Sequence, residues 1–339
     1  MKIWIDIKNS HEPGFFRAIM NHFEEHNYIV TTREYAEIND LLTRFGIEYS
    51  TFGRHYKGSN IKRGMMLLLR TIHLLTRLPP FEVALHHGSI SSTHVSKLRR
   101  RTNICFSDND ISAGMRNIYK DLDYLIVPEA ISEESMRDQG AKNARIIRFN
   151  GYKEDLYIAD FEPDPEFLNE LPFDEFVTVR AESIHAHYVP KDVKSIVPAL
   201  LKRFRRENIN VLFLPRYESD NTYIKGYENV YVPERALHGL DVVYHSNAIL
   251  TGAGTFSREA ACMGVPAISF FPGEKILAVD QKMIAEGWVF HSRDPDHILD
   301  FLLKAKKRCV DLERSKKVQA EVFHHLKSIL HKISTEKTH

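Results

Sequence analysis

The sequence predicts an α/β protein with two doubly wound parallel sheets, and three observations support this fold class. At 339 residues the chain is long enough for two domains of ordinary size. Short strand-like runs alternate with amphipathic helical stretches from end to end, which is typical of parallel sheets covered by helices on both faces. An acidic segment with three prolines, residues 160–173, interrupts this alternation near the middle.

We expect the first domain to occupy residues 1–159. Apolar runs rich in β-branched and aromatic residues predict strands at Lys2–Ile7, Tyr28–Thr32, Val83–His86, Asn103–Phe106 and Tyr124–Val127. Helical periodicity between them predicts helices at Gly14–His26, Glu37–Phe45, Ile61–Leu78, Ser92–Arg101 and Glu133–Gln139.

We expect residues 160–173 to be a linker, residues 174–333 to form the second domain and residues 334–339 to be a tail. The second domain repeats the scheme, with strands at Phe176–Val179, Val211–Leu214, Val230–Val232, Ala248–Leu250, Ala267–Phe270 and Val289–His291. Its helices are expected at Lys191–Glu207, Thr255–Met263, Val279–Glu286, Pro295–Lys307 and Leu312–Ile333. Two such domains would face a central cleft at the carboxyl ends of their strands.

Composition excludes several classes of function. The 46 basic and 45 acidic residues nearly cancel, so no global field favours nucleic acid. Cys105, Cys262 and Cys309 are far apart, which argues against a disulfide framework or a zinc ribbon and fits a reducing compartment. No apolar run approaches the ~20 residues that span a bilayer. We therefore expect a soluble, cytoplasmic protein without a metal or a bound cofactor.

The stretch most informative for function is ILTGAGTFSREAACMGVP, residues 249–266. An apolar strand leads into Gly252, Ala253 and Gly254, where a small-residue backbone lets a ligand approach closely. Thr255 then begins a helix whose first N–H groups point at the turn, which favours an anion such as a diphosphate. Glu259 lies about one turn further on, where its carboxylate could accept sugar hydroxyls. The alternative is a plain strand–turn–helix connection in which Glu259 stabilises its own helix terminus.

Other polar residues follow strands of the second domain. Arg180 and Arg216 end adjacent strands, so their guanidinium groups could clamp a phosphate together, or form surface ion pairs instead. Asp280 and Gln281 begin a later helix and could recognise sugar hydroxyls. Ordinary acidity at a helix start explains Asp280 equally well.

The turn after the first strand carries candidate acid–base groups. His11 titrates near neutrality and could deprotonate an acceptor hydroxyl, with Asp6 or Glu12 as alternatives. A surface or helix-capping histidine is the competing interpretation. Asp108, with Asp110, follows another first-domain strand and could supply a carboxylate.

Two further patterns have competing interpretations. His185 and His187 have a metal-binding spacing, but the sequence indicates no third ligand nearby. The helix Ile61–Leu78 places arginines seven residues apart beside a broad Leu/Met face, which suits anionic lipid or a lipid-linked acceptor. It also suits an ordinary domain helix whose arginines extend from a buried face.

The glycine turn with its helix, GAGTFSREAACMGVP, resembles the nucleotide-sugar site of GT-B proteins, which have two Rossmann-like domains. These include the non-hydrolysing UDP-N-acetylglucosamine 2-epimerases and the N-acetylglucosaminyltransferase that completes the lipid-linked disaccharide of peptidoglycan. The start MKIWIDIKNSHEPGFF and the run TREYAEINDLLTRFGIEYSTFG look more closely like an uncharacterised prokaryotic family, known only as a domain of unknown function. The resemblance implies that residues 252–255 bind the diphosphate and that Glu259 binds the ribose.

Departures from the epimerase pattern bear on the reaction. Those enzymes carry an aspartate in a His-Gly-Asp motif, where this chain has Ser89, and a histidine where it has Val179, although Arg180 and Glu182 are kept. Epimerisation at C2 needs acid–base groups in those places. The leading expectation is therefore a metal-independent glycosyltransferase that uses a nucleotide-diphosphate sugar. The alternatives are an epimerase or hydrolase of UDP-sugars with altered acid–base residues, and a non-catalytic nucleotide-sugar-binding protein.

Overall fold

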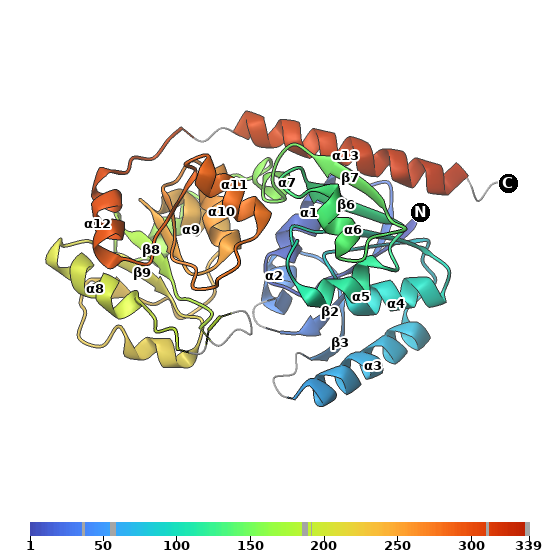
Figure 1. The fold of residues 1–339 in the computed structure, drawn as a ribbon, viewed down its shortest axis with the longest axis horizontal. Helices are drawn as coiled ribbons and strands as arrows, with labels where there is room; N and C mark the ends of the chain where they lie inside the picture. The colour runs from blue at the N-terminus through green and yellow to red at the C-terminus, as the bar shows by residue number, and fades with distance from the viewer. Residues whose placement is uncertain (36–37, 55–58, 185–188, 191, 310–311, 336–339) are drawn as a thin grey trace. The chain divides into compact units, whose positions relative to one another are not determined.

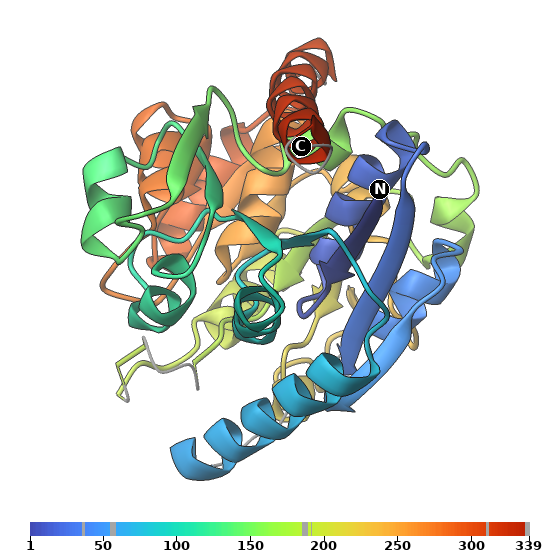
Figure 2. The same ribbon diagram turned by 90° about the vertical axis from the view of Figure 1, so that its right-hand side faces the viewer.

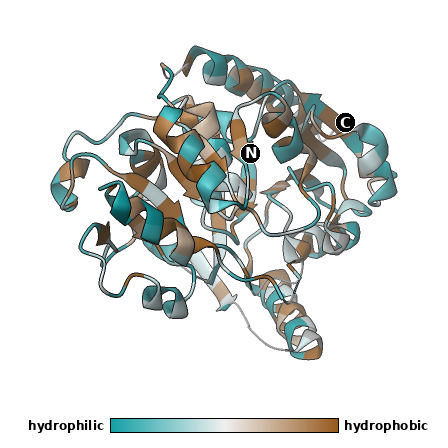
Figure 3. Ribbon diagram, turned by 60° about the vertical axis from the view of Figure 1, so that its left-hand side comes forward, coloured by the Kyte–Doolittle hydropathy of each residue, from teal (hydrophilic) through white to brown (hydrophobic). Residues whose placement is uncertain are grey.

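The computed structural model describes residues 1–35, 38–54, 59–184, 189–190, 192–309 and 312–335, and it forms two compact units. Unit 1 combines Met1–Tyr157 with Lys317–His339, and unit 2 is Ile158–Lys316. Each unit has its own parallel sheet with helices around it (Figure 1). The strands are largely apolar, as the brown colouring of Figure 3 shows.

Unit 1 has a seven-stranded sheet in the order β3-β2-β1-β4-β5-β6-β7, and every pairing is parallel. The strands are β1 Lys2–Asp6, β2 Asn27–Glu34, β3 Ser50–Arg54, β4 Val83–His86, β5 Thr102–Phe106, β6 Tyr124–Pro128 and β7 Arg145–Phe149. The helices are α1 Glu12–His22, α2 Ile38–Arg44, α3 Asn60–Arg77, α4 Ile90–Leu98, α5 Arg116–Tyr119 and α6 Glu133–Asp138, with a 3₁₀ turn at Ala113–Met115.

The strand order of unit 1 reverses direction between β1 and β4. The chain first adds strands on one side of β1 and then returns to add β4 and the later strands on the other side. The loops after β1 and β4 therefore diverge at the carboxyl edge of the sheet, which is where open α/β sheets bind ligands.

Unit 2 has a six-stranded sheet in the order β10-β9-β8-β11-β12-β13, again entirely parallel. Its strands are β8 Val177–Arg180, β9 Val211–Leu214, β10 Val230–Tyr231, β11 Ile249–Thr251, β12 Ala267–Ser269 and β13 Val289–His291. Its helices are α8 Val197–Arg206, α9 Gly239–His245, α10 Gly254–Cys262, α11 Ala278–Ala285 and α12 Pro295–Lys304, with 3₁₀ turns at Phe167–Glu170 and Glu218–Thr222. The order reverses between β8 and β11, so the turn after β11 lies at the equivalent place.

The division into units differs from the expected domains in two ways. The expected linker, residues 160–173, belongs to unit 2, because Phe167 is buried with Phe176 and Leu212 in one apolar cluster. The last helix, α13 Leu312–Thr335, belongs to unit 1 from Lys317 onward, although the sequence placed it in the second domain. The short helix α7, Asp155–Ile158, lies where unit 1 meets unit 2 along the chain.

Candidate functional site

The glycine turn of unit 2 has the predicted form of a strand, a turn and a helix. Ala253 is extended and precedes α10, and its backbone N–H donates to Thr251 Oγ1 at 3.0 Å. An alanine side chain cannot cap a helix, so the first backbone N–H groups of α10 have no capping side chain from this position. The N-terminus of α10 therefore has the polarity expected of an anion-binding turn.

Packing within the protein, and not only the approach of a ligand, requires a glycine at position 252. A Cβ built at Gly252 would lie 2.5 Å from Cγ, 2.6 Å from Cα and 2.8 Å from Cβ of Glu182. Glu182 follows β8, the strand beside β11. The close approach expected of a ligand is thus made by a neighbouring segment of the chain.

Gly252→Ala is expected to lower the free energy of unfolding by about 1–3 kcal/mol, because the added methyl group meets backbone that cannot move without shifting β8 against β11. Urea denaturation measures this change. Gly239→Ala, in the same unit, is the matched control, since a Cβ there has nothing within 4 Å. Equal stability of the two variants would contradict the close packing at Gly252.

An ion pair at the start of α10 was not anticipated from the sequence. Arg258 is 2% exposed, and its Nη1 donates to Asp280 Oδ1 at 2.7 Å while Nη2 donates to Thr255 Oγ1 at 3.3 Å. A Cβ at Gly254 would meet both members of the pair, at 2.7 and 2.8 Å. Asp280 was predicted to bind sugar hydroxyls, and the structure gives it Arg258 as a partner instead. The available signal was the charged residue Arg258, which precedes Glu259 within the helix.

Glu182 is also engaged within unit 2. It is 2% exposed and accepts hydrogen bonds from Ser195 Oγ at 2.6 Å, from the backbone N–H of Ile196 at 3.1 Å and from Arg293 Nη1 at 3.3 Å. Arg293 also donates to the carbonyl of Phe270 at 2.7 Å. Glu182 therefore joins the ends of several strands, and this geometry disagrees with its expected contact with a nucleotide sugar.

The two predicted arginines lie at neighbouring strand ends. Arg180 pairs in register with Leu214, the last residue of β9, and Arg216 follows two residues later. The Nε of Arg216 donates to the carbonyl of Ala181 at 3.3 Å, so its guanidinium lies at the end of β8. The sequence placed the two arginines at the ends of adjacent strands. The pairing of β8 with β9 agrees with this, and the Arg216 side chain reaches the end of β8.

Glu259 and Gln281 differ in exposure. Glu259 is 9% exposed, in the second turn of α10. Gln281 is exposed, and its amide donates to the carbonyl of Ile276 at 2.7 Å.

In unit 1, the Asp6 carboxylate is held in a buried hydrogen-bond network and is not open to solvent. Its side chain is 0% exposed, and Arg70 binds it through both guanidinium Nη atoms, at 2.6 and 3.0 Å. Ser89 Oγ donates to it at 2.5 Å and Thr31 Oγ1 at 2.7 Å. Burial alone would raise the pKa of Asp6, but Arg70 and the two hydroxyl donors outweigh it and hold the pKa below its ordinary value. This carboxylate does not fit the proton-accepting role expected of it.

Ser89 and Val179 occupy the places where the resembling epimerases carry acid–base residues. The Ser89 side chain donates to Asp6, and its backbone N–H donates to His86 Nδ1 at 3.0 Å. Burial lowers the pKa of His86 to about 3, so this histidine is neutral and acts structurally. Val179 is 0% exposed, within the core of unit 2. Neither place offers a titratable side chain for catalysis.

A cluster of titratable side chains lies at the carboxyl edge of the unit 1 sheet. His87 Nε2 is 3.5 Å from Asp108 Oδ1 and His87 Nδ1 is 4.0 Å from Glu12 Oε1. The ring of His11 meets that of His87 edge-on, with 5.2 Å between centroids. Lys153 Nζ donates to Asp108. The structure thus brings together the predicted His11, Glu12 and Asp108, and it adds His87 and Lys153.

The members of this cluster differ in access to solvent. Glu12 is 0% exposed and accepts from the backbone N–H of Lys8 at 2.7 Å and the amide of Asn9 at 2.6 Å. Burial raises the pKa of Glu12 despite the nearby positive groups. His11 is partly exposed, at the residue before α1. His11 is therefore the member best able to meet an acceptor hydroxyl.

The same residues are candidates for metal binding. His11, Glu12 and His87 each bring a ligand atom to within 4.8 Å of the others, a grouping found by a search of the described residues. Two histidines and a glutamate are a ligand set typical of zinc. The pair predicted at His185 and His187 lies outside the described residues.

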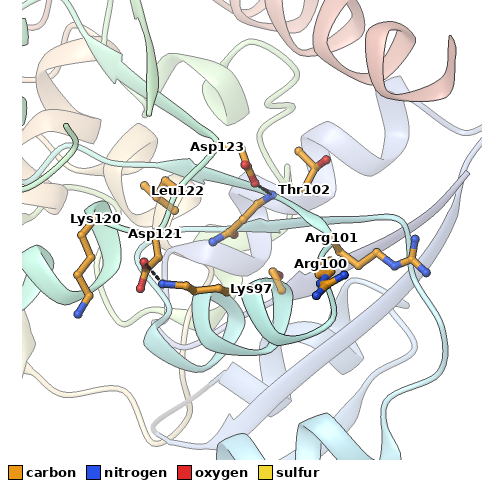
Figure 4. A pocket seen from close by; sticks show the side chains of 10 residues that line it. Lys97, Arg100, Arg101, Thr102, Lys120, Asp121, Leu122 and Asp123 are labelled. Atoms are coloured by element: carbon orange, nitrogen blue, oxygen red, sulfur yellow. Dashed lines mark hydrogen bonds and ion pairs between the residues drawn. The ribbon is translucent and has the colours of Figure 1, made fainter. Parts of the chain in front are cut away.

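The cavity in Figure 4 lies at the opposite edge of the unit 1 sheet. It has a volume of about 400 Å³ and is lined by the segments that precede β5 and β6, including Arg101 and Asp123. Lys97 and Asp121 form an ion pair at 2.5 Å within it. Because the strands are parallel, this amino edge is remote from the titratable cluster, so the cavity is not part of the candidate site.

Comparisons with known proteins agree with the family resemblance seen in the sequence. The profile of a family described as "Protein of unknown function (DUF354)" matches residues 1–336. The chain is 24% identical over 317 residues to "Uncharacterized protein MJ0665" of Methanocaldococcus jannaschii, covering 89% of this chain and 91% of that protein.

Comparison with solved structures shows proteins of similar fold. UDP-GlcNAc 2-epimerase of Methanocaldococcus jannaschii, in complex with UDP-GlcNAc and UDP, has a TM-score of 0.67 at 15% identity, over 95% of this chain and 100% of that chain. The glycosyltransferase of kitacinnamycin has a TM-score of 0.61 at 11% identity, over 98% of each chain. These likenesses confirm the GT-B-like fold, with two parallel-sheet units, that the sequence predicted.

Proposed function

The chain belongs to the DUF354 family, and we propose that it is a metal-independent glycosyltransferase that takes its sugar from a nucleotide-diphosphate donor, a UDP-sugar. A UDP-sugar-related protein of the GT-B type is supported by the fold, since a structure of the same fold is a complex with UDP-GlcNAc and UDP. The donor-binding residues in this proposal lie in unit 2, and the proton-transferring residues lie in unit 1.

We favour sugar transfer over epimerisation because of the residues at the two positions where the epimerases carry acid–base groups. Ser89 is held by Asp6, and Val179 is a core residue. A transferase needs one base for the acceptor hydroxyl, whereas epimerisation needs acid–base groups for both departure and return of UDP. His11, partly exposed, can supply that single base.

In the proposed mechanism, His11 accepts the proton of the acceptor hydroxyl as it attacks the sugar. His87 packs against His11, and Asp108 Oδ1 lies 3.5 Å from Nε2 of His87, so the ring of His87 lies between His11 and a carboxylate. The N-terminus of α10, with Arg180 and Arg216, stabilises the charge that develops on the departing diphosphate.

A UDP-sugar epimerase or hydrolase is the second candidate. Asp108 and His87 favour it, because a carboxylate and an imidazole so close together can exchange protons with a bound sugar. Release of UDP that an acceptor accelerates supports transfer. Deuterium incorporation at C2 of the sugar in D₂O supports epimerisation and would overturn the transferase proposal.

Donor binding has its own test. UDP at about 100 times its Kd should stabilise the protein by about 2.7 kcal/mol, seen as a rise in Tm. Glu259→Gln should weaken binding about tenfold or more, because a charged acceptor for the ribose hydroxyls is lost. Glu286→Gln, at the exposed end of α11, is the matched control and should keep the full shift. If UDP raised the Tm of Glu259→Gln as much as that of the unchanged protein, the assignment of Glu259 to the ribose would be contradicted.

A further inference from the structure

Helix α3 is apolar on two opposite faces. Its inner face buries Leu74, which joins Leu78 just past the helix end in the cluster around Trp4 and Phe81 of unit 1. Its outer face exposes five large apolar side chains, which are Ile61 85%, Met65 54%, Leu68 59%, Leu69 43% and Ile72 44%. Figure 2 shows the helix in light blue along the border of its unit, and in Figure 3 it carries apolar segments between polar ones.

The five exposed side chains form one stripe. At about 100° per residue, the positions 61, 65, 68, 69 and 72 fall within roughly a third of the helix circumference. The stripe spans residues 61–72 of this 18-residue helix, so it runs for about 17 Å at 1.5 Å per residue. A contiguous apolar stripe of this kind marks an interaction surface more often than scattered apolar residues do.

The charges beside the stripe have one sign. Lys62 and Arg77 are exposed and lie on one flank of it, and the sequence has no Asp or Glu from Asn60 to Arg77. Arg70, which the sequence grouped with a lipid-facing row, points inward to Asp6 and is not part of this surface.

The end of α4 lies beside the end of α3. Arg99 donates to the carbonyls of Leu75 and Leu78 at 2.6 and 2.8 Å, which ties the end of α4 to the end of α3. Leu98 beside it is 65% exposed, and Arg100 and Arg101, which also line the cavity of Figure 4, are exposed as well. The end of α4 thus brings an exposed apolar side chain and two cations close to the end of α3, in a chain of net charge only +1.

We propose that α3 and the end of α4 dock this protein on an anionic lipid bilayer. The apolar stripe would enter the interface and the flanking cations would contact lipid phosphates, as in amphipathic helices that lie in the plane of a membrane. Among the residues that the structure describes, no helix is long and apolar enough to cross a bilayer. The proposal is independent of the reaction proposed above.

The charges beside the stripe favour an anionic lipid bilayer over a second copy of the chain as the binding partner. Two copies that met through this face would bring their rows of Lys and Arg together, and like charges in contact oppose association. An anionic lipid surface satisfies both the apolar stripe and the cations.

Flotation with vesicles tests the proposal. The protein should bind vesicles of 70% phosphatidylcholine and 30% phosphatidylglycerol at 50 mM salt, and binding to phosphatidylcholine alone should be at least tenfold weaker. The charge-removing variant Lys62→Gln/Arg77→Gln should weaken binding to the anionic vesicles about 25-fold, at about fivefold for each cation. The apolar variant Leu68→Gln/Ile72→Gln should abolish it.

The controls keep this test decisive. Leu303→Gln removes a leucine that is 58% exposed on α12, outside the proposed surface, and should bind vesicles like the unchanged protein. Since the altered side chains are exposed, circular dichroism and Tm should be unchanged in all variants. Absence of vesicle binding, or equal binding by Leu68→Gln/Ile72→Gln, would overturn the proposal. So would a dimer that dissociates only in that variant without any vesicle binding, because the face would then join two copies.

Discussion

Asp6→Asn is expected to lower the free energy of unfolding by about 3–5 kcal/mol, because it leaves the Arg70 guanidinium buried without its counter-charge. The substitution keeps the shape of the side chain, so the lost charge rather than a cavity causes the effect. Urea denaturation at neutral pH measures it. Asp6→Asn/Arg70→Met, in which the buried cation is also removed, should recover a large part of the loss.

An exposed arginine–aspartate pair, also joined by two hydrogen bonds, is the control. Arg203 binds Asp296 at 2.6 and 2.7 Å, but the Asp296 side chain is 72% exposed. Exposed pairs contribute little because water screens them, so Asp296→Asn should leave stability almost unchanged. Similar losses in Asp6→Asn and Asp296→Asn would show that the burial of Asp6 is not the cause.

The Asp6 effect should depend on pH. The folded protein holds the pKa of Asp6 below its ordinary value of 3.8, so the ionised form is favoured in the folded state. The stability contributed by Asp6 is therefore complete above pH 3.8 and is lost as the pH falls through the folded-state pKa. In that acid range, the free energies of unfolding of the unchanged protein and of Asp6→Asn should become more similar. Chemical denaturation at a series of pH values can follow this change.

His11→Gln is expected to lower kcat for UDP release by about 10²–10⁴-fold, the usual contribution of a general base. The measurement uses the nucleotide sugar that gives the largest thermal shift, with water as the acceptor. The thermal shift itself should not change, because the proposed donor-binding residues lie in unit 2. His297→Gln, at an exposed position on α12, is the control.

The outcomes for His11 separate its role from a structural one. Loss of kcat with an unchanged thermal shift and Tm supports proton transfer by His11. Loss of stability with an equal loss of nucleotide binding would assign His11 to packing against His87 instead. Unchanged kcat would remove His11 from the proposed mechanism.

Much of the fold was predictable because local patterns determine it. Buried parallel strands leave apolar runs, and the strands predicted at Val83–His86, Val211–Leu214 and Val289–His291 match the structure residue for residue. The strand β3 was not predicted, because Ser50–Arg54 is a mostly exposed edge strand with Phe52 as its one large apolar residue. Periodicity predicted the helix α13 but could not identify the unit against which it packs.

The candidate site was only partly predictable, because long-range partners decide what a polar residue does. Asp6 ends a strand, as catalytic carboxylates often do, but its partner Arg70 is 64 residues away. Gly252 was expected where a ligand approaches the backbone, whereas the group that approaches it in the structure is Glu182. Lys153 follows β7, a strand that the sequence did not indicate, so its contact with Asp108 had no local signal.

The place of α13 in unit 1 constrains how the chain folds during its synthesis. Phe323 of α13 packs with His22 and Phe23 at the end of α1, with ring centroids 4.4 and 5.6 Å apart, and Val322, Phe323 and Leu326 are all buried. The packing of α1 therefore cannot be completed until α13 has been synthesised, and all of unit 2 is made in between. Unit 1 emerges with part of its core uncovered, and it can close only when α13 becomes available.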